Sequence, residues 1–176
     1  YADVFIQHLE VDPHLIGLAD LQRLAVSAGS EAWAEENRAN CLDLLFSVLI
    51  EPHLEDGLVL VYDYPACQAA LAKCAEDRQG RPISRRFEAF LNGVELANGY
   101  CELTDATEQA ARFAEDQRLR ESSGKAVVAA DKHLLAAMEA GLPECAGVAL
   151  GVDRLLMQLQ GKDSIEQVMP FSWERC

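Results

Sequence analysis

Two glutamates, Glu88 and Glu95, lie on either side of a predicted tight turn at Asn92-Gly93. An Asn-Gly pair between two runs of strand character is the strongest short-range signal for a β-hairpin. In a regular register Glu88 pairs with Ala97, and both glutamates lie on one face of adjacent strands. Two carboxylates on one surface repel each other unless a cation lies between them, and Mg²⁺ shared with substrate phosphates is the natural candidate. The alternative is a solvated sheet face that carries two acids.

A second polar group follows on the same segment, because Asn98, Tyr100 and Glu102 alternate along the strand and therefore share a face. An amide, an aromatic ring and a carboxylate could together bind a small cationic amine. An ordinary polar strand end explains the same residues. Strict alternation places Glu95 and Asn98 on opposite faces, so one shared site requires an irregular strand, for which Gly99 makes a bulge possible.

The third candidate is the segment GVALGVDR, residues 147–154. Its apolar residues predict a strand, but Gly147 and Gly151 weaken a strand unless a backbone or a ligand must come close. Gly151 would let a nucleotide lie against the strand, and Arg154 at the start of the next helix could bind phosphate. A strand, a glycine and a helix in this order are weak evidence when taken alone.

The hydrophobic pattern predicts the elements that position these residues. Helices are expected over residues 18–28, 39–50, 105–121, 131–141 and 152–159, and strands over 58–62, 87–91, 94–98 and 147–151. The strand at 58–62 is expected to be short and buried. Antiparallel strands with interspersed helices and no regular βαβ alternation indicate an α+β domain.

Composition excludes several classes of protein. The 176 residues include 29 Asp and Glu against 15 Lys and Arg, a net charge of −14 that disfavours extensive non-specific binding to nucleic acid. We find no run long enough to span a membrane. The six cysteines form no CxxC pair, which is typical of reduced thiols in a cytoplasmic protein. The four histidines have no metal-ligand spacing, and Cys67 has no evident base partner for a nucleophilic role.

Taken together, the three groups resemble the catalytic domain of class II aminoacyl-tRNA synthetases, in the lysyl branch. GVALGVDR resembles the third signature motif of that class, and RFEAFLNGVELANGYCELTDATEQAARF resembles the lysyl-type strand pair for ATP and amino acid. The resemblance covers essentially the whole chain and implies an antiparallel sheet flanked by helices. The first and second signature motifs are absent. Residues 1–176 are therefore expected to form either the C-terminal portion of the domain in a longer protein or a degenerate fragment. In both cases they would hold only part of the active site and be inactive alone.

The resemblance also implies a role for each candidate residue. Glu88 and Glu95 would hold magnesium bound to ATP, and Leu96 would contact the nucleotide through its backbone. Gly151 and Arg154 would bind the nucleotide, with Arg154 as the catalytic residue at the γ-phosphate. The pocket for a lysine-like substrate would consist of Asn98, Tyr100, Glu102 and Ala149, with Glu102 binding an amino group.

Within this family the sequence is most similar to paralogues that modify elongation factor P. The segments FIQHLEVDP, YDYPACQAALAK and PFSWERC, together with alanine at position 149, favour these paralogues over true synthetases. The resemblance implies ATP-dependent activation of (R)-β-lysine, or less well lysine, and transfer to a lysine of elongation factor P. It also implies a homodimer for the intact protein, with tRNA an improbable partner. The alternatives are a lysine–tRNA ligase and a non-catalytic fragment that binds a lysine-like metabolite.

Overall fold

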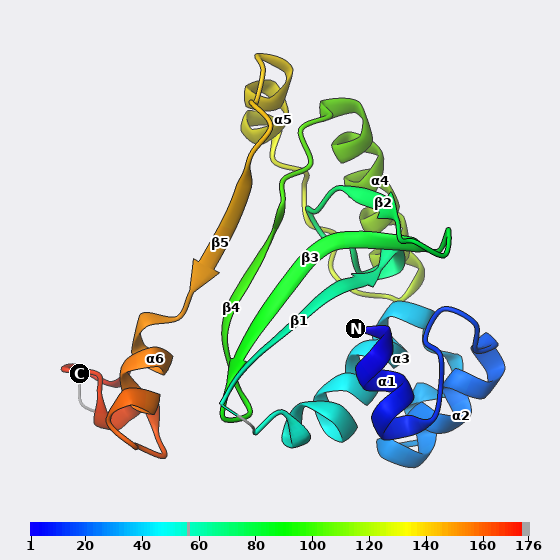
Figure 1. The fold of residues 1–176 in the computed structure, drawn as a ribbon. Coiled ribbons are helices and arrows are strands. Elements are labelled where there is room, and N and C mark those ends of the chain that lie inside the picture. The colour runs from blue at the N-terminus through cyan, green and yellow to red at the C-terminus, as the bar shows by residue number, and fades with distance from the viewer. Residues whose placement is uncertain (56, 174–176) are drawn as a thin grey trace.

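The structure is a computed structural model that describes residues 1–55 and 57–173 (Figure 1). The helices are α1 (Ala2–Leu9), α2 (Leu18–Ala28), α3 (Arg38–Leu45), α4 (Ala106–Ser122), α5 (Lys132–Glu139) and α6 (Val152–Leu159). The strands are β1 (Leu58–Pro65), β2 (Cys74–Glu76), β3 (Pro82–Leu91), β4 (Val94–Cys101) and β5 (Ala146–Leu150). None of the helices within these described ranges is long and apolar enough to cross a membrane.

The strands form one antiparallel sheet, which confirms the expected α+β class. Its order is β1-β3-β4-β5, and the short β2 pairs with the start of β3. Helices α1–α3 gather beside β1, whereas β5 and α6 lie at the opposite side of the sheet (Figure 1). The predicted hairpin and the GVALG strand are therefore neighbours, with β4 between β3 and β5.

The predicted turn and caps explain why the elements begin and end where they do. Asn92 and Gly93 both have positive φ, 50° and 78°, as a two-residue type I′ hairpin turn requires. The Asp105 side chain accepts hydrogen bonds from backbone N–H groups in the first turn of α4. Asp131 caps α5 in the same way. These local signals were sufficient to predict both helix starts.

Two predicted elements differ in detail from the structure. The helix expected over 39–50 is α3 followed by a wider π-helical turn, Phe46–Ile50, which buries both of its end residues in the core. The strand expected over 58–62 is β1, which extends to Pro65 and is not fully buried. Exposed and covered side chains alternate along its first half. Leu58, Leu60 and Tyr62 are 65%, 56% and 62% exposed. Their run of apolar residues resembles a buried strand, but only one face of β1 is covered.

The hydrophobic core lies between α1–α3 and that covered face of the sheet. Aromatic rings form its centre, where Phe46 stacks on Tyr1 at a centroid distance of 5.4 Å and makes a tilted contact with Phe90 at 5.7 Å. The buried residues of this core are Tyr1, Phe5, Leu21, Ala25, Cys41, Leu42, Leu45, Phe46, Ile50, Leu54, Val61, Tyr64 and Phe90. Strands β1 and β3 are thus anchored by helices, and β4 and β5 extend beyond them.

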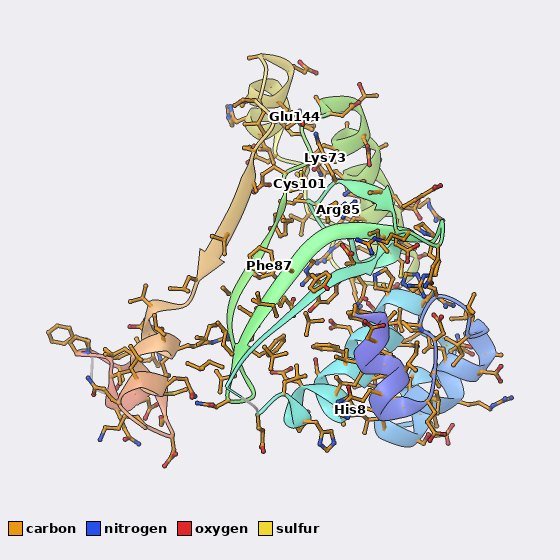
Figure 2. The ribbon with its side chains drawn as sticks, viewed as in Figure 1. His8, Lys73, Arg85, Phe87, Cys101 and Glu144 are labelled. Atoms are coloured by element: carbon orange, nitrogen blue, oxygen red, sulfur yellow. The ribbon has the colours of Figure 1, made fainter. Side chains whose placement is uncertain are left out.

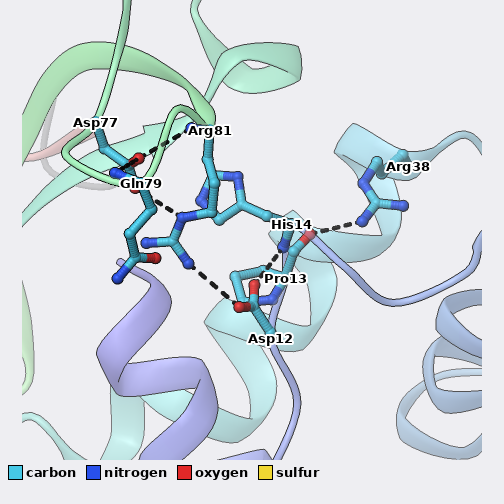
Figure 3. Close-up of polar contacts among 7 residues, drawn as sticks. All are labelled: Asp12, Pro13, His14, Arg38, Asp77, Gln79 and Arg81. Atoms are coloured by element: carbon cyan, nitrogen blue, oxygen red, sulfur yellow. Dashed lines mark hydrogen bonds and ion pairs between the residues drawn. The ribbon is translucent and has the colours of Figure 1, made fainter.

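A polar network joins the loop after α1 to the β2–β3 turn (Figure 3). Arg81 Nε lies 2.6 Å from Asp77 Oδ2, and Arg81 Nη1 lies 3.2 Å from Asp12 Oδ2. Asp12 also accepts a 2.8 Å hydrogen bond from the backbone N–H of His14. Burial, reinforced by the positive charge of Arg81, lowers the pKa of His14 below its usual value.

Candidate active site

A bulge in β4 decides which side chains share a face. The register begins as predicted, with Leu91 opposite Val94 and Phe90 opposite Glu95, but it then shifts by one residue. Glu88 lies opposite Asn98, so the predicted pairing of Glu88 with Ala97 is wrong. The strand is irregular between Glu95 and Asn98, as a single site requires. However, the extra residue is Leu96, and Gly99 stays in regular register opposite Phe87.

Because of this bulge, the two predicted polar groups lie on one face of the sheet. Residues directly opposite each other share a face, as do residues two apart. Asn98 lies opposite Glu88 on one side and Ala149 on the other, and Tyr100 lies opposite Gly147. The predicted site residues on this face are Glu88, Glu95, Asn98, Tyr100, Glu102 and Ala149. Arg85 and Phe87, labelled in Figure 2, alternate with these positions on β3 and belong to the other face.

Glu88 is buried at the centre of a hydrogen-bonded network. Its Oε2 accepts a 2.6 Å hydrogen bond from the Tyr64 hydroxyl, and its Oε1 accepts from Asn98 Nδ2 at 3.0 Å. Arg86 forms an ion pair with Glu88, and its guanidinium lies over the Tyr64 ring, 4.7 Å from the centroid. Burial and the neighbouring Glu88 charge raise the pKa of Tyr64, so the hydroxyl stays a proton donor. Sequence reasoning missed both Tyr64 and Arg86.

Glu95 is held by the arginine of the GVALGVDR segment. Arg154 Nη1 lies 3.4 Å from Glu95 Oε2 and donates to the Glu95 backbone carbonyl at 3.0 Å. The backbone N–H of Gly151 donates to the Leu96 carbonyl at 2.8 Å, which ties the start of α6 to the bulge. A Cβ on Gly151 would meet only ordinary contacts, and its φ of −76° suits any residue. Neither conformation nor packing in the described structure therefore requires glycine at this position.

The structure explains why the other glycine of that segment, Gly147, has no side chain. A Cβ built on Gly147 would come within 2.2 Å of Glu102 Oε1, so the Glu102 carboxylate lies directly over this glycine. Glu102 is also joined to the same end of the sheet by a 3.0 Å hydrogen bond from its N–H to the Cys145 carbonyl. The missing side chain of Gly147 thus makes room for the carboxylate.

Glu102 differs from the other two glutamates in its partners. Among the described residues its carboxylate forms neither an ion pair nor a hydrogen bond, whereas Glu88 and Glu95 each carry an arginine. The neighbouring Lys73 forms its ion pair with Glu144 instead (Figure 2). A half-buried carboxylate beside the half-buried Tyr100 ring and the Asn98 amide is suited to an incoming ammonium group.

A third carboxylate near Glu88 and Glu95 was not foreseen. Glu51 begins the short 3₁₀ turn Glu51–His53, and burial raises its pKa, as do the charges of Glu95 and Glu88. Arg154 acts in the opposite direction and lowers it. Glu51 is far from the hairpin in sequence and sits in no motif, so no local pattern indicates that it faces the same charges.

These carboxylates have the chemistry that magnesium prefers, but they do not form a complete metal site in advance. Carboxylate oxygens are the protein ligands that Mg²⁺ prefers, and the repulsion that Glu51 experiences from Glu95 and Glu88 favours an added cation. Within the described residues, however, no group of three or more His, Cys, Asp or Glu is arranged to hold a metal ion. The residues therefore suit an ion that arrives with phosphate ligands of its own.

Comparison with known proteins identifies the family to which the chain belongs. Residues 29–175 match the family of tRNA synthetases class II (D, K and N), and the chain belongs to this family. Over its full length it is 44% identical to the elongation factor P–(R)-β-lysine ligases of Klebsiella pneumoniae subsp. pneumoniae and Sodalis glossinidius. It is 42% identical to the ligase of the same name from Salmonella typhi. The chain spans 54% of the length of each of these relatives.

Proposed function

We propose that residues 1–176 are the C-terminal portion of the catalytic domain of a ligase that activates (R)-β-lysine, and less well lysine, with ATP. The amino-acid carboxylate would attack the α-phosphorus of ATP, form an aminoacyl-adenylate and release pyrophosphate. The side-chain amine of a lysine on elongation factor P would then attack the acyl carbon and release AMP. The names of the relatives support this substrate and this acceptor.

The observation that carries the proposal is the carboxylate of Glu102, which has no cationic partner among the described residues and lies over Gly147. In the proposed complex this carboxylate binds an amino group of the substrate. The Tyr100 ring contacts the same ammonium, the Asn98 amide donates or accepts a hydrogen bond, and the Ala149 methyl group limits the pocket.

Magnesium and the triphosphate would bind at the other end of the same face. Glu88 and Glu95 would hold the ion, whose chemistry is to neutralise phosphate charge. Arg154 would bind the γ-phosphate, Gly151 would allow the nucleotide to approach, and Leu96 would contact it through its N–H, since its carbonyl accepts from Gly151. The homodimer of the full-length protein remains a prediction.

The acceptor distinguishes this proposal from a lysine–tRNA ligase. We expect the full-length protein, with ATP, magnesium and (R)-β-lysine, to increase the mass of elongation factor P by one aminoacyl group. The same reaction with tRNALys should leave the tRNA uncharged, in line with the strongly acidic chain. Charging of the tRNA without modification of elongation factor P would replace the proposal by the tRNA ligase alternative. Adenylate formation in neither reaction would favour a non-catalytic binding domain.

A further inference from the structure

Each of the two glutamates assigned to magnesium is neutralised by an arginine of this chain. Glu88 pairs with Arg86 from its own strand, and Glu95 pairs with Arg154 from α6. The third glutamate of the face, Glu102, has no such partner among the described residues. An arginine on a metal-binding carboxylate opposes the metal, because it supplies the positive charge that the ion would otherwise supply.

The two ion pairs differ strongly in how firmly they are held. The side chains of Arg86 and Glu88 are only 18% and 11% exposed, and Tyr64 and Asn98 donate to the same carboxylate. Removing one partner of a buried pair leaves an uncompensated charge, so this arrangement is expected to persist.

The pair of Arg154 and Glu95 is open to solvent. Its side chains are 49% and 35% exposed, and the side-chain contact is a single one of 3.4 Å. Exposed ion pairs contribute little to stability, so a competing anion has to replace only this weak pair and the exposed 3.0 Å hydrogen bond from Arg154 to the Glu95 backbone carbonyl. The hydrogen bond from Gly151 to the bulge holds the start of α6 in place, so only the Arg154 side chain has to move.

We propose that Arg154 is an exchangeable counter-ion that keeps the metal carboxylate Glu95 neutralised until a triphosphate arrives. This inference rests on the proposed function, because it uses the nucleotide that the function requires. When the phosphates attract Arg154, Glu95 is released and faces the charge of Glu51. Glu95 then has no positively charged partner among the described residues, and a divalent cation can bind in place of Arg154. Metal binding is thereby made conditional on nucleotide binding.

We expect metal affinity to rise when the proposed phosphate ligand Arg154 is removed. In the full-length protein, Arg154→Met should increase the affinity for Mn²⁺ in the absence of nucleotide by roughly five-fold, which corresponds to about 1 kcal/mol. The same variant should bind ATP more weakly than wild type. Electron paramagnetic resonance, which detects free Mn²⁺ during a titration, measures the first effect. Calorimetry with ATP measures the second.

Two further variants make the test specific. Arg85→Met removes an arginine that pairs with Asp63 and lies on the other face of β3, and it should change neither affinity. Adding Glu95→Gln to Arg154→Met should return the nucleotide-free Mn²⁺ affinity to the wild-type value or below. Unchanged or weaker Mn²⁺ binding by Arg154→Met would overturn the inference, and so would tight Mn²⁺ binding by nucleotide-free wild type. Failure of the proposed function would appear separately, as wild-type protein that does not bind ATP.

Discussion

At the scale of single residues, the Glu88 network explains how a carboxylate can be buried in an acidic chain. A buried charge needs a counter-charge and hydrogen bonds to its remaining lone pairs. Arg86 supplies the first, and Tyr64 and Asn98 supply the second. The cation–π contact between Arg86 and Tyr64 connects the counter-charge to one of these hydrogen-bond donors. Glu88 is therefore held in one position before any substrate binds.

The Tyr64 hydroxyl is the part of this network that can be removed with least change in shape. Tyr64→Phe keeps the ring under Arg86 but deletes a hydrogen bond to a buried charged group, so the free energy of unfolding should fall by about 1.5 kcal/mol. Urea denaturation measures the change. The matched control is Tyr62→Phe on the same strand, whose side chain is exposed and which should have no effect. Equal losses in the two variants would show that the hydroxyl does not support Glu88.

His14 makes the stability of the protein depend on pH, and the direction of its pKa shift gives the sign. Its pKa in the folded state is lowered by burial and by the positive charges of Arg81 and Arg38, against the opposing charges of Asp12 and Asp77. The unfolded chain therefore takes up the proton first, and stability is lost as the pH falls through the unfolded value of 6.5. Above this range His14 is neutral in both states and contributes no pH dependence.

His14→Gln should therefore make the free energy of unfolding less dependent on pH between 7.5 and about 5. Thermal or urea unfolding at a series of pH values measures the slope. The control is His133→Gln on α5, an exposed site that lies outside this network. A wild-type slope that persists in His14→Gln would attribute the effect to another group.

At the scale of elements, the bulge at Leu96 and the two glycines of β4 and β5 arrange the site. Gly99 and Gly147 face different neighbours. A Cβ on Gly99 would lie 2.6 Å from the Gly147 carbonyl and 2.7 Å from the Phe87 ring, whereas a Cβ on Gly147 would meet the flexible end of Glu102. Gly99 thus allows the strands to pack closely, and Gly147 leaves space for the Glu102 side chain.

Substitution of these two glycines should affect different properties, substrate binding for Gly147 and protein stability for Gly99. Gly147→Ala should displace the Glu102 carboxylate, because that side chain can move, so (R)-β-lysine binding should weaken at least about ten-fold with little loss of stability. Gly99→Ala meets backbone and a ring, and should lower the free energy of unfolding by more than about 1 kcal/mol. Calorimetry and urea denaturation measure the two effects. Unchanged binding in Gly147→Ala would place the amino group elsewhere.

The elements were largely predictable from sequence because their signals are local. The Asn92-Gly93 turn and the caps Asp105 and Asp131 determine where the hairpin and α4 and α5 begin. The bulge was not predictable in position, because the required irregularity between Glu95 and Asn98 indicates only that an extra residue is needed. Gly99 suggested the wrong position for the bulge. Its lack of a side chain instead leaves room for the Phe87 ring.

The parts of the site that sequence did not reveal depend on contacts between distant segments. Tyr64 reaches Glu88 across 24 positions, and Glu51 approaches the hairpin from the end of the helical region. Neither residue belongs to a motif with a characteristic spacing. Arg86, although it lies two residues from Glu88, has a spacing that fits a solvated strand equally well. Such partners are identified only when the fold brings them together.

At the scale of the whole molecule, the two faces of the sheet have different surroundings. The face with the site is covered by α1–α3 at its β1 end. The opposite face exposes a set of apolar side chains, Leu58, Leu60, Tyr62, Val148 and Leu150. Extended exposed apolar surface usually marks a contact surface. The chain spans about half the length of the curated relatives it matches.

The proposed function requires this face to bind ATP beside a lysine-like amino acid that is held by Glu102. Exchange of labelled pyrophosphate into ATP by the full-length protein tests it most directly. We expect (R)-β-lysine to support exchange, lysine to support it less, and aspartate and asparagine not at all. Glu102→Gln should lower kcat/KM for (R)-β-lysine at least about 30-fold, which corresponds to about 2 kcal/mol, with the KM for ATP nearly unchanged. Exchange driven by aspartate or asparagine, or an unaffected Glu102→Gln variant, would contradict the account.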